Sequence, residues 1–249
     1  MDKSSIGVEH FKVRSYQMDT KARLTLTSIA DFLQESAGNH ADSNGFGFHH
    51  MQKSGLLWVL TRMKIKIHRL PVWNDELELS TWVVNREKFF SRRDFEIKSK
   101  SGKILISAGS GWMLIDFKRK RPHLVDNVLM NIEMFPDKLA INEELIKIED
   151  PTMVNSEKLY HVKYSDLDIA QHTNNTQYQR IILDTFSFGF RNKHHIKAFE
   201  INYLAEALID EGLKILTSRT KEKNVFVHEI QRTNDKKIIC RAISGWEED

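Results

Sequence analysis

The chain has 249 residues, 41% of them hydrophobic and 29% charged, which is the composition of a globular protein. No apolar run approaches the roughly 18–20 residues of a membrane-spanning helix, and the N-terminal residues lack a signal-peptide pattern, so we expect a cytoplasmic protein. Lys and Arg number 37 against 34 Asp and Glu, and a net charge of +3 gives no support for nucleic-acid binding.

Cysteine and histidine usage argues against a metal centre. Cys240 is the only cysteine, which excludes an intramolecular disulfide and a cysteine-rich metal site. The 11 histidines include two adjacent pairs, and none falls in a HExxH arrangement. We therefore predict neither a metal nor a cofactor.

The first half is predicted to contain a strand, a helix and a meander of four antiparallel strands. Residues 11–20 alternate weakly, as in a strand, and a helical pattern then begins after Thr25 and ends near Gly38. A glycine-rich loop follows at 43–50 and lacks the spacing of a phosphate-binding loop. Residues 56–116 contain the four strand-like segments, separated by turn residues.

Residues 118–155 interrupt this order. The segment begins with the basic run Lys118–Arg121, continues with three prolines and ends acidic, which predicts a linker with a short helix. We accordingly place an N-terminal unit at 1–135, a linker at 136–155 and a C-terminal unit at 156–249.

The second half repeats the order of the first. Residues 159–169 predict a strand, 176–190 a helix, and four strand-like segments follow up to Trp246. Aligning the halves at an offset of 149 residues places Asp19 on Asp168 and Arg23 on His172. Further along the offset is 136, and Ser110-Gly111-Trp112 finally corresponds to Ser244-Gly245-Trp246.

This repeat predicts the fold class. A helix followed by antiparallel strands can bury its apolar face against its own sheet. Two such units give an α+β protein with the tandem, or double, hotdog architecture, in which two antiparallel sheets each wrap around a long helix.

The segment Tyr164–Phe186 concentrates the side chains with catalytic chemistry. Asp168 and His172 lie at its start, where alternation with apolar residues predicts a strand end, and apolar residues recur at helical spacing after it. The polar residues 171–176, just before this helical pattern, suit a helix N-cap. The free amides of a helix N-terminus can stabilise an oxyanion. Because these residue types are also common in strand-to-helix turns, a purely structural interpretation stays open. The capping and positioning candidates are Asn174, Asn175 and Thr176.

Three stretches together resemble the acyl-acyl-carrier-protein thioesterases of plants and bacteria, and the resemblance covers most of the chain. FLQESAGNHADSNGFG is similar to the family's leucine-glutamine-glutamate helix. LLWVLTRMKIKIHRLPVWNDELELSTWV resembles its W-V-x-T-R-M strand and P-x-W-x-D turn, and SDLDIAQHTNNTQY resembles its D-x-D-x-N-x-H-x-N-N-x-x-Y signature. The resemblance implies hydrolysis of the thioester between a fatty acyl chain and acyl carrier protein, which ends chain elongation. It also implies an acyl-chain pocket in the N-terminal unit and catalytic groups in the C-terminal unit.

Carried over residue by residue, the signature marks Asp168 and His172 as catalytic, and the downstream stretch INYLAEALIDEGL adds Glu206, expected on a strand. Two positions depart from the family. Its Asn two residues before the His is Ala170 here, and its plant-type Cys after the Glu is Ala207. A cysteine nucleophile at that position is therefore impossible.

Without a nucleophile, attack by an activated water is the simplest scheme. Glu206 or Asp168 would act as general base, and His172 would share in the proton transfer or hold the water. Amides near Asn174–Thr176 would stabilise the tetrahedral oxyanion. For Cys240 we prefer a buried strand residue over a nucleophile.

Other residues are candidates for substrate contacts. Aromatic side chains of the first half are equally compatible with a pocket lining and with ordinary core. Basic residues are candidates for docking the acidic carrier protein, and a solvated face is the alternative. The substrate-binding candidates are Phe46, Phe48 and Trp58 for the pocket, and Arg92, Arg93, Lys118 and Arg119 for docking.

Three alternatives remain at this stage. The first is an acyl-CoA thioesterase of the same fold, and the second is a non-catalytic acyl-binding hotdog module. A hotdog hydratase is the third and resembles the sequence least. No nucleic-acid or membrane partner is expected, and the chain is expected to be a monomer or a homodimer.

Overall fold

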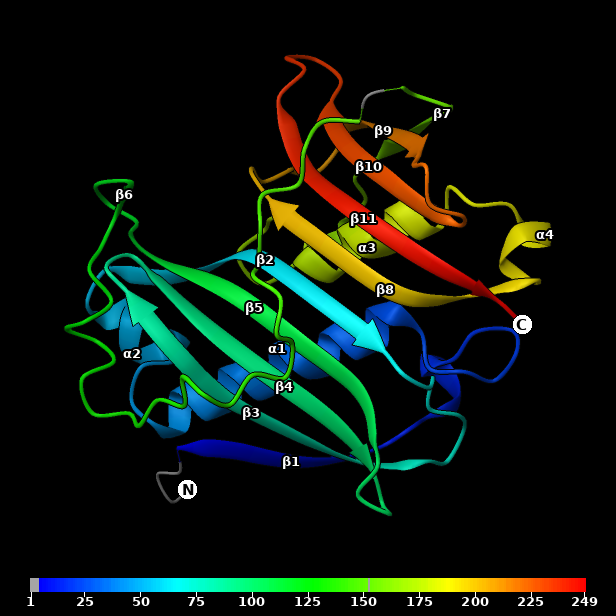
Figure 1. Cartoon of the computed structure of the whole chain (residues 1–249). Helices are drawn as coiled ribbons and strands as arrows, with labels where there is room; N and C mark the ends of the chain where they lie inside the picture. Colours follow the sequence, from blue (N-terminus) through cyan, green and yellow to red (C-terminus); the bar gives the residue numbers. More distant parts are fainter. Residues whose placement is uncertain (1–4, 152) are drawn as a thin grey trace. The chain divides into compact units, whose positions relative to one another are not determined.

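The computed structural model describes residues 5–151 and 153–249 (Figure 1). It divides into two compact units, residues 1–145 and 146–249, and the division falls inside the segment expected to be a linker, 136–155. Each unit has its own antiparallel strands and its own helices, which confirms the predicted α+β class. Within the described residues, no helix is long and apolar enough to cross a membrane.

The strands of the N-terminal unit follow the order β1-β3-β4-β5-β2, and β6 pairs with the end of β5. All neighbouring pairs are antiparallel. The strands are β1 (Ile6–Lys12), β2 (Leu56–Ile67), β3 (Glu76–Glu87), β4 (Phe90–Ser99), β5 (Ile104–Asp116) and β6 (Arg121–Pro122).

The prediction of a simple four-strand meander was wrong, because β2 pairs with β5 rather than with β3. The turn between β2 and β3 does not close a hairpin, since its main chain bonds elsewhere. The Leu24 amide donates to the Pro71 carbonyl at 2.8 Å, and the Val13 amide donates to the Asp75 carbonyl at 3.0 Å. The edge beside β3 is occupied by β1, with Phe11 opposite Leu77.

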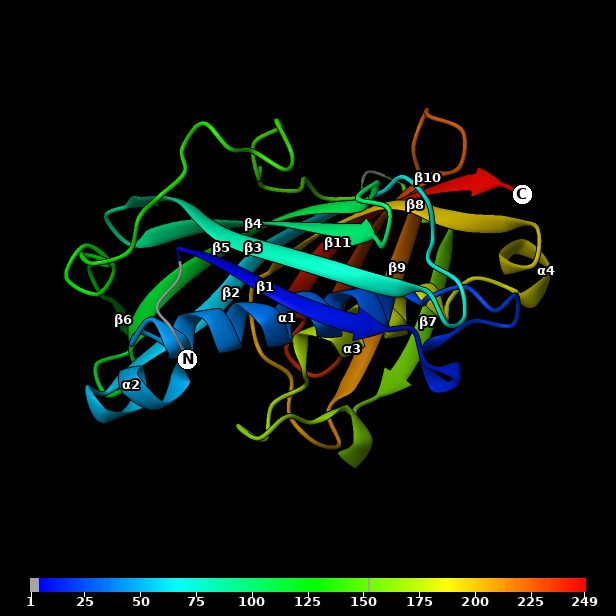
Figure 2. The ribbon, with the colours of Figure 1, turned by 90° about the horizontal axis from the view of Figure 1, so that it is seen from below.

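The long helix α1 (Leu26–Ser43) lies along one face of this sheet, beside β1 and β3 (Figure 2). Thr25 caps it by accepting a hydrogen bond from the Ser28 amide. The helix continues past Gly38, where we expected it to end, because His40 and the residue after it extend the buried face. A second, short helix, α2 (Phe48–Lys53), occupies part of the expected glycine-rich loop.

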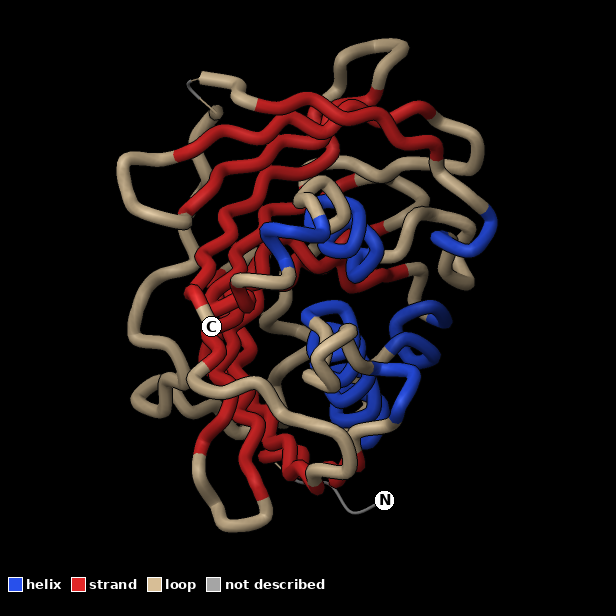
Figure 3. The backbone as a smooth tube through the Cα atoms, turned by 90° about the vertical axis from the view of Figure 1, so that its right-hand side faces the viewer, coloured by secondary structure: helices blue, strands red, loops and turns tan. Residues whose placement is uncertain are grey.

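The C-terminal unit repeats the same sheet, in the order β7-β9-β10-β11-β8, again with antiparallel neighbours. Its strands are β7 (Ser156–His161), β8 (His194–Tyr203), β9 (Gly212–Arg219), β10 (Val225–Arg232) and β11 (Ile238–Glu248). In each unit the helices lie on one side of the strands (Figure 3).

The second unit has a shorter helix than the single one expected over 176–190. It contains α3 (Asn175–Leu183) and, after a break, α4 (Phe188–Arg191). At the break the Thr185 hydroxyl donates to the Ile182 carbonyl at 2.7 Å. Ser187 then caps the next helix by accepting from the Phe190 amide at 3.2 Å. Local hydroxyl bonds therefore end the first helix and begin the second.

Equivalent hydrogen bonds show that the two units share the same backbone arrangement. The amides of His68 and Arg69 both donate to one carbonyl of β5, and those of Leu204 and Ala205 donate likewise to one carbonyl of β11. The indole of Trp112 donates to Ser110, two residues before it, and the Trp246 indole makes the same bond to Ser244. These bonds repeat the offsets found in the sequence.

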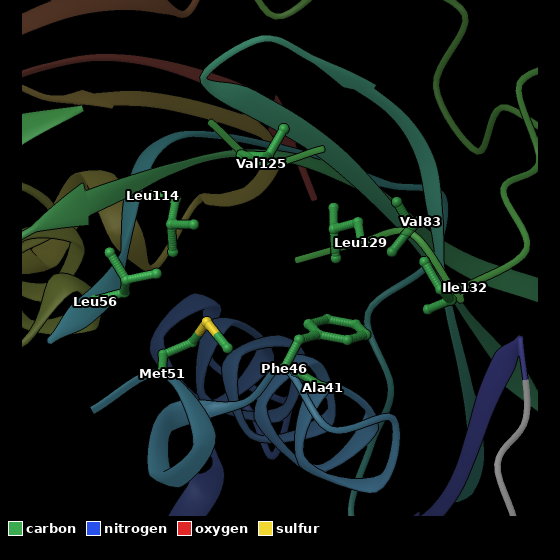
Figure 4. Close-up of a cluster of buried hydrophobic side chains, with 9 residues drawn as sticks. All are labelled: Ala41, Phe46, Met51, Leu56, Val83, Leu114, Val125, Leu129 and Ile132. Atoms are coloured by element: carbon green, nitrogen blue, oxygen red, sulfur yellow. The ribbon is translucent and has the colours of Figure 1, made fainter. Parts of the chain in front are cut away.

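An apolar cluster fills one part of the N-terminal unit between helices and sheet. Phe46 and Met51 point from the helical side toward Val83 and Leu114 of the strands (Figure 4). Burial of such side chains is the main force that holds a helix against a sheet. The cluster consists of Ala41, Phe46, Met51, Leu56, Val83, Leu114, Val125, Leu129 and Ile132.

Residues 133–151 form an extended strap, and the short helix expected there is absent from this described stretch. Polar side chains of each unit hold the part of the strap that belongs to it. The buried Asp94 carboxylate accepts a hydrogen bond from the Ala140 amide at 2.9 Å, and Asn202 Oδ1 accepts one from the Ile148 amide at 2.7 Å. The strap is therefore ordered by side chains of the sheets rather than by a structure of its own.

Candidate active site

The turn that carries His172 is held by the Asp168 carboxylate. Asp168 Oδ1 accepts hydrogen bonds from the Ala170 amide at 2.8 Å and from the His172 amide at 3.4 Å. The Asp168 amide donates back to the His172 carbonyl at 2.9 Å, and Gln171 has a left-handed φ of 63°. Asp168 thus shapes the turn through its main chain and side chain.

His172 and Glu206 lie together, as the sequence predicted. His172 Nε2 is 3.4 Å from Glu206 Oε2, and the two side chains are 36% and 62% exposed. Glu206 was expected on a strand and instead lies in the loop after β8. The Leu204 and Ala205 amides both donate to the Ile239 carbonyl, and this shared bond ends the ladder before Glu206.

A buried anchor joins the Glu206 loop to the His172 turn. The Ala207 carbonyl accepts hydrogen bonds from the Thr173 amide at 2.9 Å and the Thr173 hydroxyl at 3.0 Å. The Ala207 amide donates to the Tyr178 hydroxyl on α3 at 3.0 Å. All three residues are buried. Residues on both sides of the His–Glu pair are therefore fixed, although the pair itself reaches solvent.

In the first turn of α3, one amide has no acceptor within the described part of the chain. Asn174 Oδ1 caps the helix by accepting from the Thr176 amide at 3.0 Å, and the Asn174 carbonyl accepts from the Gln177 amide at 2.9 Å. The Asn174 amide itself donates to the Asp166 carbonyl. Among the described residues, none accepts from the Asn175 amide. Asn175 is therefore the amide available to an oxyanion at this helix end.

Asp166, for which we predicted no role, anchors the approach to α3. Its 1% exposed carboxylate accepts hydrogen bonds from the Tyr160 hydroxyl and the Lys163 amide at 2.8 Å each, and from Arg180 at 2.6 Å. The strand predicted over residues 159–169 was wrong in its second half, because β7 ends at His161 and these bonds close the 3₁₀ turn Tyr164–Asp166. Sequence alternation could not predict the pairing of Asp166 with Arg180, because Arg180 lies on α3, 14 residues further along the chain.

The N-terminal unit repeats the turn without the pair. Asp19 Oδ1 accepts from the Lys21 and Arg23 amides at 2.8 and 3.0 Å, and Ala22 has a φ of 58°, like Gln171 in the second copy. Arg23 stands at the position of His172, and its Nε bonds back to Asp19 Oδ2 at 3.1 Å. The turn itself therefore does not require a catalytic partner.

The aromatic candidates for substrate binding lie in the N-terminal unit. Phe46 is buried in the apolar cluster, and the half-buried Trp58 packs against it and donates its indole N–H to the Phe46 carbonyl at 2.8 Å. Phe48 is 39% exposed on α2, with its ring edge against His49. Contact with an acyl chain stays a prediction for all three candidates.

Two of the four docking candidates do not form an accessible basic surface. Arg93 is 5% exposed and donates inward to His40 Nδ1 at 2.9 Å and Thr81 Oγ1 at 3.1 Å. Arg92 lies on the opposite face of β4, and its Nε forms an ion pair with Oδ1 of the buried Asp94 at 2.8 Å. Adjacent residues of a strand point to opposite faces, so these two neighbours could not share one surface.

The basic run remains exposed. Lys118, Arg119 and Lys120 lie in the turn between β5 and β6, and Arg121 begins β6. Asp116 Oδ1 accepts hydrogen bonds from the Lys118 and Arg119 amides. These bonds, the one from Arg119 most of all, lower the pKa of Asp116. The Arg119 side chain is 81% exposed and lies 3.8 Å from Asp116. A role in docking stays a prediction for this turn.

Cys240 is fully buried on β11, which confirms the expectation of a buried strand residue. Burial raises the pKa of its thiol far above the ordinary value, which disfavours the thiolate that a nucleophile requires. Within residues 5–151 and 153–249, no three His, Cys, Asp or Glu side chains are grouped to hold a metal ion.

Two protein-family models match the chain in sequence. Residues 7–132 match the acyl-ACP thioesterase N-terminal domain, and residues 149–248 match the C-terminal domain of the same family. A palmitoyl-acyl carrier protein thioesterase of Gossypium hirsutum is 32% identical over 96% of this chain and 63% of its own length. An oleoyl-acyl carrier protein thioesterase of Arabidopsis thaliana is 30% identical over 96% and 75% respectively.

Solved structures show the same fold. An acyl-ACP thioesterase of Bacteroides thetaiotaomicron superimposes with a TM-score of 0.82 and 28% identity, and the match covers 98% of both chains. The 12:0-ACP thioesterase of Umbellularia californica gives a TM-score of 0.85 and 25% identity, over 99% of this chain and 98% of that one. These matches confirm the double hotdog. The chain belongs to the acyl-ACP thioesterase family.

Proposed function

We propose that this protein hydrolyses fatty acyl-acyl-carrier-protein to free fatty acid and carrier protein, and so ends chain elongation. The observation that carries the proposal is the contact of His172 Nε2 with Glu206 Oε2 at 3.4 Å. Three residues after His172, the Asn175 amide of α3 has no acceptor among the described residues. Its plant and bacterial relatives, named for this activity, support the substrate class.

Glu206 is better placed than Asp168 to act as the general base. Both hydrogen bonds that the Asp168 carboxylate accepts hold the turn, and Asp19 accepts the same bonds in the copy that lacks the histidine. Glu206 has no equivalent duty, because its side chain faces His172 and solvent. We therefore assign turn formation to Asp168 and proton abstraction to Glu206.

The reaction then needs only water and the groups of this site. Glu206 takes a proton from a water held by His172 as the oxygen attacks the thioester carbonyl. The Asn175 amide stabilises the tetrahedral oxyanion. When the C–S bond breaks, the thiolate leaves and takes up the proton that Glu206 received, and the carboxylic acid product loses its own proton to solvent. Thiolates are good leaving groups, so the site does not need a strong acid at this step.

The test is release of free thiol from a panel of acyl-carrier-protein thioesters of different chain lengths. We expect turnover by the wild type and a loss of at least about 100-fold in Glu206→Gln and His172→Ala, in the range that general base catalysis contributes. Glu222→Gln, at an exposed glutamate in the turn between β9 and β10, is the matched control and should keep its activity.

Wild-type turnover in Glu206→Gln would remove that residue from the mechanism, and no turnover of any carrier thioester by the wild type would overturn the proposed substrate. Preference for acyl-CoA in the same assay would favour the CoA enzyme instead. A cytoplasmic location and a monomeric or dimeric state stay predictions.

A further inference from the structure

Tyr178 is a buried hydroxyl that the catalytic scheme does not use. It is 2% exposed on α3, and its hydroxyl accepts the Ala207 amide at 3.0 Å, one residue after Glu206. Burial raises the pKa of the Tyr178 phenol, so the phenol stays neutral and is not a base. Its connection to the chemistry runs through the backbone of the Glu206 loop.

The N-terminal copy shows what the fold itself requires at this place. There the Leu24 amide donates to the Pro71 carbonyl at 2.8 Å, as the Thr173 amide donates to the Ala207 carbonyl at 2.9 Å. This main-chain bond is common to both copies. Pro71 has no N–H to donate, and Leu24 has no hydroxyl.

At the offset of 149 residues, Tyr178 corresponds to Ile29, which is fully buried. At the offset of 136, Glu206 corresponds to Leu70, which is also buried. The sister copy therefore packs the same frame with apolar side chains and needs no buried phenol. A buried hydroxyl is costly unless it is hydrogen-bonded. Only the copy that contains Glu206 has this buried phenol, and the difference between the copies points to a function for it.

We infer that Tyr178 is a positioning residue, which holds the Glu206 loop against His172 through the Ala207 amide. The inference rests on the proposed function. Thr173 assists from the other side, because its hydroxyl donates to the Ala207 carbonyl at 3.0 Å. The peptide groups of Ala207 are thus fixed at both ends, which sets the position from which the exposed Glu206 side chain reaches His172.

The experiment is a double-mutant cycle on the full chain, with thiol release as the assay. Tyr178→Phe should lower kcat about 10- to 50-fold, in the range expected for misplacement of a catalytic group, with KM changed less than about twofold. In Tyr178→Phe/Glu206→Gln, kcat should equal that of Glu206→Gln alone within about twofold, since nothing is left to position. Tyr16→Phe is the control, at an exposed tyrosine of the N-terminal unit, and should keep its kcat.

A purely structural tyrosine would instead give folded protein with unchanged kcat, or equal losses from Tyr178→Phe with and without the Glu206→Gln change, and either result overturns the inference. If Glu206→Gln itself keeps wild-type activity, the proposed mechanism fails, and that outcome is separate. Should Tyr178→Phe not fold, Thr173→Val tests the same anchor. It keeps the main-chain bond and should lower kcat about two- to fivefold, with recovery in Thr173→Ser. Unchanged kcat in Thr173→Val would then overturn the inference.

Discussion

His228 should make the protein less stable in mild acid. The imidazole is fully buried on β10 between two hydroxyls, with Nδ1 3.0 Å from Thr217 Oγ1 and Nε2 2.8 Å from Ser244 Oγ. The rings of Phe186 and Phe226 lie beside it. A neutral imidazole can serve both hydroxyls, while burial without a carboxylate lowers the pKa of His228 from 6.5 to about 3.

The sign and size follow from this difference. Below pH 6.5 the unfolded chain binds a proton at His228, whereas the folded chain does not. The free energy of unfolding therefore falls as the pH falls. At pH 5 the loss from His228 alone is about 2 kcal/mol, and it declines towards zero as the pH rises above 6.5.

The measurement is urea unfolding of the wild type and His228→Gln at pH 8 and pH 5. The variant should be less stable at pH 8, because it replaces a fitted imidazole. Its deficit should shrink by about 2 kcal/mol at pH 5, where the wild type bears the protonation penalty and glutamine does not. His161→Gln, at an exposed histidine of β7, is the control. A deficit that stays constant with pH would refute the assignment of a buried neutral imidazole.

Two further predictions concern residues from the sequence analysis. Cys240→Ala should keep kcat within about twofold in the thiol-release assay, because a buried, protonated thiol takes no part in the chemistry, and a loss comparable to that of Glu206→Gln would restore a thiol mechanism. Lys118→Glu/Lys120→Glu should raise KM for acyl-carrier-protein about tenfold at low salt and leave acyl-CoA hydrolysis unchanged, because only the carrier is a large acidic partner. Equal effects on both substrates would remove the turn from docking.

Much of the fold could be predicted from the sequence because its signals are local or periodic. Strand alternation revealed the long strands that follow the helix in each half, and the Asp19–Asp168 correspondence revealed the repeat, since the same turn needs the same residue twice. The Asn174 cap was predictable for the same reason, because a helix start needs an acceptor within three residues. The order of strands in the sheet was not, since it depends on bonds made by the turn after β2.

The site was predicted less completely, because its supports are long-range. Glu206 came from resemblance alone, since a loop glutamate after a strand has no distinguishing pattern. Arg93 appeared to belong to a basic surface, but its partner His40 is 53 residues away in the chain. Tyr178 matches the last residue of the family signature and recurs at helical spacing, but neither pattern indicates the partner of its hydroxyl.

The two copies of the Asp turn also separate what the fold requires from what the proposed activity requires. Main-chain bonds and one carboxylate maintain the turn in both halves, although most of the other side chains of the turn differ between them. The half with Pro71 cannot recover the anchor by a side-chain change at Ile29 alone, because proline lacks the N–H that a phenol would accept. To build a second anchored site in the first half, changes at both Pro71 and Ile29 would therefore be needed.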